Sequence, residues 1–205
     1  MIGILDYGAG NLASVSKAVE YLGEDCIATN DLDRLRNASG LILPGVGAFG
    51  EAVKNLKKNG FVDFIPDYLK SGRPFLGICL GLQLLFNESE ETPGAMGINL
   101  LSGKIRKIPA ENGLKVPHVG WNSLEINPSS RLFKGIRENE YVYFVHSYYL
   151  EADDPCDIAA RTVYGVKIDA AVERDNLFAC QFHPEKSGRA GLMILQNFID
   201  ITKEA

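Results

Sequence analysis

Continuous apolar runs and amphipathic segments alternate along the first part of the chain, and another apolar run follows near its end. The apolar runs occupy residues 2–6, 25–29, 40–43, 75–79 and 177–182. Strands buried on both faces of a parallel sheet read as continuous apolar runs, whereas helices repeat apolar residues every three or four positions. The alternation therefore predicts an α/β fold with a doubly wound, mostly parallel sheet flanked by helices.

The segments between these runs have helical patterns. Apolar residues recur on one face of residues 12–22, with Asn11 as the expected N-cap and Gly23 as the expected stop. Further helical segments are expected at residues 31–37, 51–58, 61–70 and 80–86. The predicted strands of the first part thus alternate with predicted helices, as a doubly wound sheet requires.

The pattern changes in the second half of the chain to short runs separated by turn residues. These runs cover residues 104–108, 116–119, 123–126, 141–149, 159–164 and 170–174. Such runs are typical of antiparallel strands, and no linker of adequate length divides them from the rest of the chain. We expect antiparallel strands that extend one end of the sheet, and a single domain over residues 1–205.

A cysteine lies at the junction between the strand at 75–79 and the helix expected after it. The sequence GICLG at residues 77–81 has the pattern of a sharp strand-to-helix turn that presents a nucleophile, with sulfur in place of the serine oxygen. The two glycines remove Cβ atoms that would collide with neighbouring chain, and a helix N-terminus favours the thiolate of Cys79. A buried structural cysteine between two glycines is the alternative interpretation.

A second glycine-rich segment, PGVGAFG at residues 44–50, follows the predicted strand at 40–43. Its glycines leave main-chain N–H groups uncovered, as an oxyanion site requires. Nucleophile elbows combine the N–H after the nucleophile, here that of Leu80, with one from another loop. Alone, the segment would be a flexible turn, but together with the elbow it is a candidate second oxyanion donor.

The last apolar run leads into His183-Pro184-Glu185. On an extended backbone, residues i and i+2 point to the same side. The imidazole is then placed to act as general base and acid for Cys79, while the carboxylate fixes its tautomer. A surface histidine beside an acid is the alternative for any single His-x-Glu. His118 and His146 are alternative bases, but neither is followed by an acid that would orient it.

Composition and charge limit the classes of partner. The chain has 46% apolar and 23% charged residues and a net charge of −5, which is unlike a nucleic-acid-binding or polybasic membrane-binding protein. Without a signal-like or membrane-spanning run, a cytoplasmic protein is expected. The sequence GAG at residues 8–10 lacks the other features of a dinucleotide site, so no cofactor is expected.

The cysteines are widely spaced along the chain. They stand at Cys26, Cys79, Cys156 and Cys180. This spacing suggests neither a metal site nor a disulfide framework. Cys26 and Cys180 lie in apolar runs and are expected to be small core residues.

Three motifs, in this order, resemble those of the class I, triad-type glutamine amidotransferases: PGVGAFG at 44–50, GICLGLQLLF at 77–86 and FHPEKS at 182–187. The resemblance runs from Met1 to the last helix. Within that class, three more are similar to the glutaminase subunit of imidazole glycerol phosphate synthase: DYGAGN at 6–11, PHVGWN at 117–122 and FVHSYY at 144–149. The alternatives are a glutaminase subunit of another class I amidotransferase, and a stand-alone cysteine hydrolase or binding module of the same fold.

The resemblance implies a reaction and a set of site residues. Cys79 would attack the side-chain amide of glutamine, His183 would protonate the leaving ammonia, and Glu185 would orient His183. The residues that correspond to the oxyanion site are Leu80, Val46 and Gly47, and those that correspond to the glutamine site are Gly45, Gln83, Glu91, Ser147 and Tyr148.

The resemblance also implies a protein partner. In the family, the ammonia passes to a (β/α)₈-barrel cyclase subunit, with which the glutaminase forms a heterodimer in histidine biosynthesis. The residues expected at this interface are Asn11, Trp121, Tyr143 and Lys186. No metal or cofactor is implied for the glutaminase itself.

Overall fold

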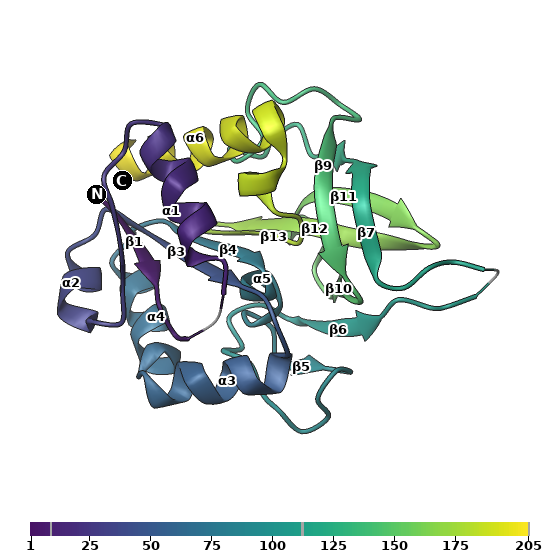
Figure 1. The fold of residues 1–205 in the computed structure, drawn as a ribbon, viewed down its shortest axis with the longest axis horizontal. Helices are drawn as coiled ribbons and strands as arrows, with labels where there is room; N and C mark the ends of the chain where they lie inside the picture. The colour runs from purple at the N-terminus through teal and green to yellow at the C-terminus, as the bar shows by residue number, and fades with distance from the viewer. Residues whose placement is uncertain (9, 112, 205) are drawn as a thin grey trace.

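Strands from distant parts of the chain form one large sheet (Figure 1). The computed structural model describes residues 1–8, 10–111 and 113–204. In this part of the chain the strand order is β2 (Cys26–Thr29), β1 (Ile2–Leu5), β3 (Gly40–Gly45), β4 (Phe75–Cys79), β13 (Leu177–Cys180), β12 (Val166–Arg174), β11 (Ile158–Tyr164) and β8 (Glu125–Ile126). Neighbours from β2 to β13 pair in parallel, and β12, β11 and β8 continue the sheet in antiparallel fashion. The predicted mostly parallel sheet with an antiparallel extension is confirmed.

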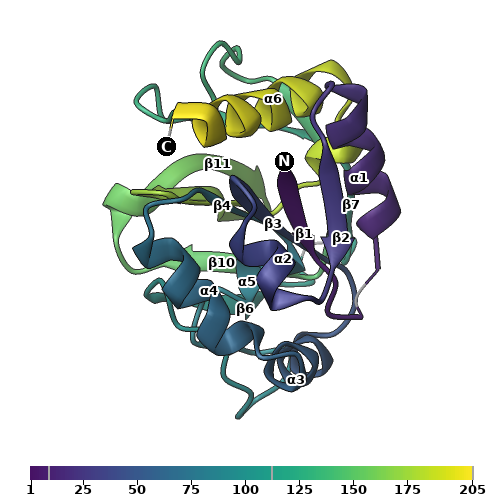
Figure 2. The same cartoon turned by 90° about the vertical axis from the view of Figure 1, so that its left-hand side faces the viewer.

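Helices cover both faces of this sheet (Figures 1 and 2). One face carries α1 (Leu12–Tyr21) and α6 (Gly188–Glu204), and the other carries α2 (Leu32–Arg36), α3 (Phe49–Lys58) and α4 (Phe61–Lys70). Successive strand side chains point to opposite faces, so Ile4 joins the core with α1 and α6 while Leu5 joins the core with the other helices. Each fully buried side chain of this kind contributes about 1.5–3 kcal/mol of transfer free energy. The two cores therefore fix the strand ends from which the site is built.

Two smaller sets of strands lie beside the large sheet instead of extending it. One set has the order β10 (Tyr148–Ala152), β6 (Gly103–Lys107) and β5 (Glu88–Ser89), and the other is an antiparallel ribbon of β7 (His118–Ser123) and β9 (Tyr141–His146). The expectation that all the short runs extend one end of the large sheet is wrong for these strands. The run predicted at 141–149 divides at Ser147, whose carbonyl accepts a hydrogen bond from the N–H of Ile108 at 2.9 Å. The chain changes its partner strand at that residue.

The helix expected at 80–86 is wrong in length. The observed helix α5 (Leu80–Gln83) is a single turn, and Leu84, Leu85 and Phe86 are all buried. The carbonyl groups of Leu84 and Leu85 accept hydrogen bonds from the N–H groups of Ile98 and Leu100, both at 2.8 Å. The N–H groups of Leu85 and Phe86 still make turn bonds to the carbonyls of Leu82 and Gln83, but the carbonyls of Leu84 and Leu85 pair with a neighbouring segment, so the α-helix does not continue. Among the described residues, no helix combines the length and apolar character needed to span a bilayer.

Candidate active site

The turn at Cys79 has the strained backbone that the flanking glycines predict. Cys79 has φ 55° and ψ −106°, a conformation that costs a residue with a Cβ atom about 1–3 kcal/mol. A Cβ atom at position 81 would lie 1.9 Å from the carbonyl oxygen of Leu43, and one at position 77 would lie 2.8 Å from that of Gly81. Both glycines are therefore required for β4, α5 and β3 to approach this closely.

Cys79 opens onto a cavity of about 320 Å³. Its lining residues are Val46, Gly47, Cys79, Leu80, Gln83, Glu91, Pro117, Val145, His146, Ser147 and Tyr148. The structure thus brings all the residues predicted for the oxyanion and glutamine sites into one cavity, except Gly45. Gly45 instead is the register partner of Cys79 across β3 and β4.

The protein itself holds two of the polar side chains in this cavity. Oε2 of Glu91 accepts a hydrogen bond from the N–H of Phe49 at 2.8 Å, at the start of α3, which leaves its other oxygen for a ligand. Nε2 of Gln83 donates to the carbonyl of Tyr148 at 3.1 Å and to Oε1 of Gln181 at 3.0 Å. Both N–H bonds of Gln83 are used in this way, so its carbonyl oxygen is the group that remains for a ligand.

His183 and Glu185 form a buried pair beyond the end of β13. Nδ1 of His183 lies 2.7 Å from Oε1 of Glu185, and both side chains are fully buried. The chain forms a 3₁₀ turn over Pro184–Lys186, so this turn, rather than an extended strand, brings the carboxylate to the ring. Among the described residues, Nε2 of His183 makes no hydrogen bond, which leaves it available for the thiol proton.

The electrostatics of this pair favour a charged imidazolium and carboxylate. Burial alone would lower the pKa of His183, but attraction to the Cys79 sulfur and the Glu185 carboxylate raises it to about 9. Burial acts to raise the pKa of Glu185, and hydrogen bonds from His183 and Asn11 outweigh it, so the net shift is downward. A histidine close to a cysteine sulfur, oriented by a carboxylate, is the arrangement of a cysteine nucleophile with its general base and acid.

The other cysteines are poor candidates for the nucleophile. Burial raises the pKa of Cys180 well above its ordinary value, and burial also raises that of Cys26. Nearby Asp154 raises the pKa of Cys156. Cys180 is buried as predicted, whereas Cys26 is only half-buried because β2 is at the edge of the sheet. All three thiols stay protonated at neutral pH and lack the strained turn of Cys79.

Gln181 contacts the thiol, although the sequence analysis did not single it out. Its Nε2 donates to Sγ of Cys79 at 3.5 Å, and its side chain is fully buried. One feature of the sequence could have indicated Gln181. It is a glutamine inside the apolar run FACQF, and a polar side chain in a buried strand needs hydrogen-bond partners. Gln181 thus links Gln83 to Cys79.

Asn11 is the N-cap residue of α1, as expected, and its carbonyl accepts a hydrogen bond from the N–H of Val15 at 3.3 Å, but its side chain does not cap the helix. It occupies the N-cap position with φ 79° but makes no side-chain hydrogen bond to the helix. Its Nδ2 instead donates to Oε1 of Glu185 at 2.6 Å. Asn11 therefore contacts the Glu185 carboxylate. This contact could not be predicted from the sequence, because the two residues are far apart in the chain.

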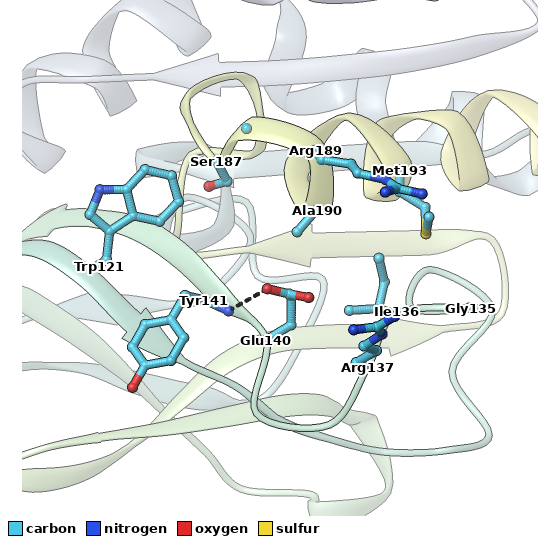
Figure 3. Close-up of a pocket in the computed structure, with 11 residues that line it drawn as sticks. Trp121, Gly135, Ile136, Arg137, Glu140, Tyr141, Ser187, Arg189, Ala190 and Met193 are labelled. Carbon is cyan, nitrogen blue, oxygen red and sulfur yellow. Dashed lines mark hydrogen bonds between the residues drawn. The ribbon is translucent and has the colours of Figure 1, made fainter.

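The other residues expected at a partner interface lie on the surface. Trp121 is 55% exposed and contacts Tyr143 edge to face, with ring centroids 6.1 Å apart on neighbouring strands of the β7–β9 ribbon. Lys186 is exposed, one residue after the triad carboxylate. Trp121 also borders a second cavity of about 490 Å³ with Tyr141 and the start of α6 (Figure 3). That cavity is larger than the first, but neither Cys79 nor His183 lines it.

His118 and His146, the alternative bases, form a buried pair of their own. Nδ1 of His118 lies 3.0 Å from Nε2 of His146, whose Nδ1 lies 2.8 Å from the carbonyl oxygen of Tyr148. Burial lowers the pKa of His118 to about 4 and that of His146 to about 3. Both rings are neutral at pH 7, and the chain of contacts holds the Tyr148 main chain at the cavity edge.

Acidification is expected to destabilise the protein through this pair. An unfolded histidine takes up a proton near pH 6.5, whereas the folded pair stays neutral until about pH 4, so stability falls as the pH drops between these values. Below pH 6, His183 is protonated in both the folded and the unfolded chain, so it adds no pH dependence to the free energy of unfolding there. Replacing His118 with Gln should reduce the slope between pH 5 and 6 by about 1.4 kcal/mol per pH unit. Urea unfolding at each pH measures it, and an unchanged slope would contradict the neutral pair.

Known proteins resemble this chain over almost its whole length. The family model for glutamine amidotransferase class-I matches residues 4–201. An imidazole glycerol phosphate synthase subunit HisH from Caldanaerobacter subterraneus subsp. tengcongensis is 49% identical and covers 99% of both chains. The subunit of the same name from Methanothermobacter thermautotrophicus is 50% identical and covers 99% of this chain and 100% of its own.

Solved structures show the same fold at much lower identity. A glutamine amidotransferase crystal structure superposes with a TM-score of 0.77 at 19% identity, covering 98% of both chains. A chain of PurLQS from Thermotoga maritima superposes with a TM-score of 0.75 at 20% identity, covering 97% of both. The family match over residues 4–201 and the full-length relatives agree: this chain belongs to the class I glutamine amidotransferases.

Proposed function

We propose that this chain is the glutaminase subunit of an imidazole glycerol phosphate synthase. It hydrolyses glutamine to glutamate and ammonia and passes the ammonia to a cyclase subunit. The cyclase makes imidazole glycerol phosphate and an aminoimidazole carboxamide ribonucleotide in histidine biosynthesis. The observation that carries the proposal is full-length identity of about half to subunits of that name, together with a thiol, an imidazole and a carboxylate at one site. We infer that residues 1–205 act as one domain, in the cytoplasm.

The geometry supports a thioester mechanism. The Cys79 thiolate attacks the side-chain carbonyl carbon of glutamine, and the protonated His183 gives its proton to the departing ammonia. Water, deprotonated by His183, then attacks the thioester carbon, which releases glutamate and restores the Cys79 thiolate and the protonated His183. Glu185 stays ionised and holds the ring through the 2.7 Å contact with Nδ1. Atoms balance as glutamine plus water giving glutamate plus ammonia.

The remaining lining residues suit glutamine. The N–H of Leu80 opens α5 directly after the thiol and, with an N–H from the Gly45–Gly47 loop, is placed to stabilise the oxyanion. Gly47 has φ 109°, which only glycine adopts readily, so this peptide has the freedom to present its N–H. Glu91 supplies a negative charge for the α-ammonium, Gln83 an acceptor, and the main chain at Ser147 and Tyr148 contacts for the α-carboxylate.

The surface of the β7–β9 ribbon supports a protein partner. Val119, Trp121 and Tyr141 are each at least 55% exposed, and Tyr143 lies beside Trp121. Large exposed apolar residues gathered on one face mark interaction sites. We infer that the cyclase, a (β/α)₈ barrel, docks on this face in a heterodimer, with Lys186 at its edge.

Glutamate release with and without a partner tests the proposal. The purified chain is assayed alone and then together with a cyclase subunit and the nucleotide substrate of that cyclase. The cyclase is taken from the organism of one of the two relatives described above. We expect stimulation by the cyclase, and Trp121→Ala should weaken that stimulation while leaving the fold intact. Tyr21→Ala, which removes an aromatic ring 77% exposed at the end of α1, is the matched control. Activity that ignores the cyclase would keep the thiol enzyme but reject the synthase assignment.

A further inference from the structure

Asn11 connects the loop after β1 with the triad carboxylate. Its Nδ2 donates to Oε1 of Glu185 at 2.6 Å and lies 3.5 Å from Nδ1 of His183. Oε1 of Glu185 therefore interacts with both the imidazole ring and the Asn11 amide. Asn11 is partly exposed, whereas the side chains of Glu185 and His183 are fully buried. It thus lies at the outer end of a chain of contacts that runs through Glu185 to the imidazole ring of His183.

The chain gives up local stability to make this contact. Asn11 stands at the N-cap of α1, where its side chain would ordinarily satisfy a helix N–H, worth about 0.5–2 kcal/mol. It makes no such bond, and it adopts the left-handed conformation with φ 79°. Residues that break local rules in this way cluster at functional sites, where other interactions compensate. The compensating interaction here is a charge-assisted hydrogen bond to Glu185.

We propose that Asn11 is a positioning residue of the triad, which fixes the Glu185 carboxylate in the orientation that holds His183. This inference rests on the proposed glutaminase function. One donor leaves a carboxylate able to rotate about its last torsion, and a second donor on the same oxygen removes that freedom. Asn11 is not among the residues that line the glutamine cavity. Its loss should therefore lower turnover and leave glutamine binding nearly unchanged.

Two substitutions separate positioning from packing. Asn11→Gly removes the amide and keeps a residue that accepts φ 79° without strain, so the fold should be retained. It should lower kcat about ten- to a hundredfold, as expected for a lost hydrogen bond to a charged group, with KM changed little. Asn11→Asp keeps the shape but replaces the donor with a carboxylate against Glu185. Its kcat should fall below that of the glycine variant, whereas a space-filling role predicts wild-type turnover.

Asn99→Gly is the matched control, because Asn99 is an exposed asparagine with φ 60° away from the triad. It should leave kcat and KM unchanged. The assay uses the full chain with its cyclase partner and determines kcat and KM from rates measured over a range of glutamine concentrations. Wild-type kcat in Asn11→Asp, or a rise in KM alone in Asn11→Gly, would overturn the positioning role. If the unmodified chain releases no glutamate, the proposed function fails instead, so the two failures are distinguishable.

Discussion

Replacing Cys79 with alanine is expected to abolish glutamate release, with a loss on the order of 10⁵- to 10⁶-fold, as when other enzymes lose their nucleophile. In the proposed mechanism the sulfur of Cys79 forms the thioester, and the other three thiols are not among the residues that line the cavity and have raised pKa values. Alanine keeps the Cβ atom, so the backbone strain at φ 55° is the same in both proteins. The variant should therefore fold normally and still bind glutamine.

Glutamate production and thermal unfolding, measured side by side, check this expectation. Cys156→Ala removes an exposed thiol and is the matched control, with wild-type turnover expected. Activity that survives in Cys79→Ala at more than a trace would mean that another group attacks the amide. Lost activity accompanied by lost folding would contradict the argument that alanine preserves the turn.

Changing Glu185 to glutamine should reduce kcat by about 10²- to 10⁴-fold, the range seen when the orienting acid of a triad is neutralised. The amide has the shape of the carboxylate but no charge, so it neither holds the protonated ring nor keeps the pKa of His183 raised to about 9. Glu185 is not among the residues that line the cavity, so KM for glutamine should change little. Steady-state kinetics in the presence of the cyclase give both constants.

Glu173→Gln is the matched control for this change. Glu173 is a largely buried carboxylate on β12, paired with Arg131 at 2.8 Å, and its neutralisation should affect stability but not kcat. A Glu185→Gln enzyme with near-normal kcat would show that His183 is oriented by another group. Equal losses of kcat in both variants would point to general destabilisation rather than to triad geometry.

Features set by local pattern were predictable from the sequence. The run at 75–79 must be buried on both faces, and the two glycines around Cys79 have few explanations other than close chain contact, here with the carbonyl of Leu43. The order of glycine loop, elbow and His-x-Glu likewise indicated the sulfur, the imidazole and the carboxylate, and these inferences needed only periodicity and spacing. The other cavity residues, such as Gln83, Glu91 and Tyr148, were indicated by the resemblance to the class I glutamine amidotransferases.

Features set by tertiary competition were not predictable in the same way. Asn11 has the residue type and position of an N-cap. Its side chain nevertheless donates to the charged carboxylate of Glu185, which is far away in sequence, and not to the helix. The main chain after Gln83 leaves the helix because Ile98 and Leu100 supply N–H donors to it. The runs that form β7 and β9 are short and separated by turn residues, as are those that form the antiparallel strands of the large sheet, so the separate pairing of the ribbon is not visible in the pattern.

The most direct test of the central claim is to trap the acyl-enzyme. The chain, with its cyclase partner, is mixed with glutamine, quenched in acid within one turnover and digested for peptide mass mapping. The mechanism predicts a glutamyl adduct on the peptide that contains Cys79. The amount of adduct should be larger in Glu185→Gln if that change slows hydrolysis of the thioester more than its formation. Glutamate produced without an adduct on Cys79, or with an adduct on Cys156 instead, would contradict the account.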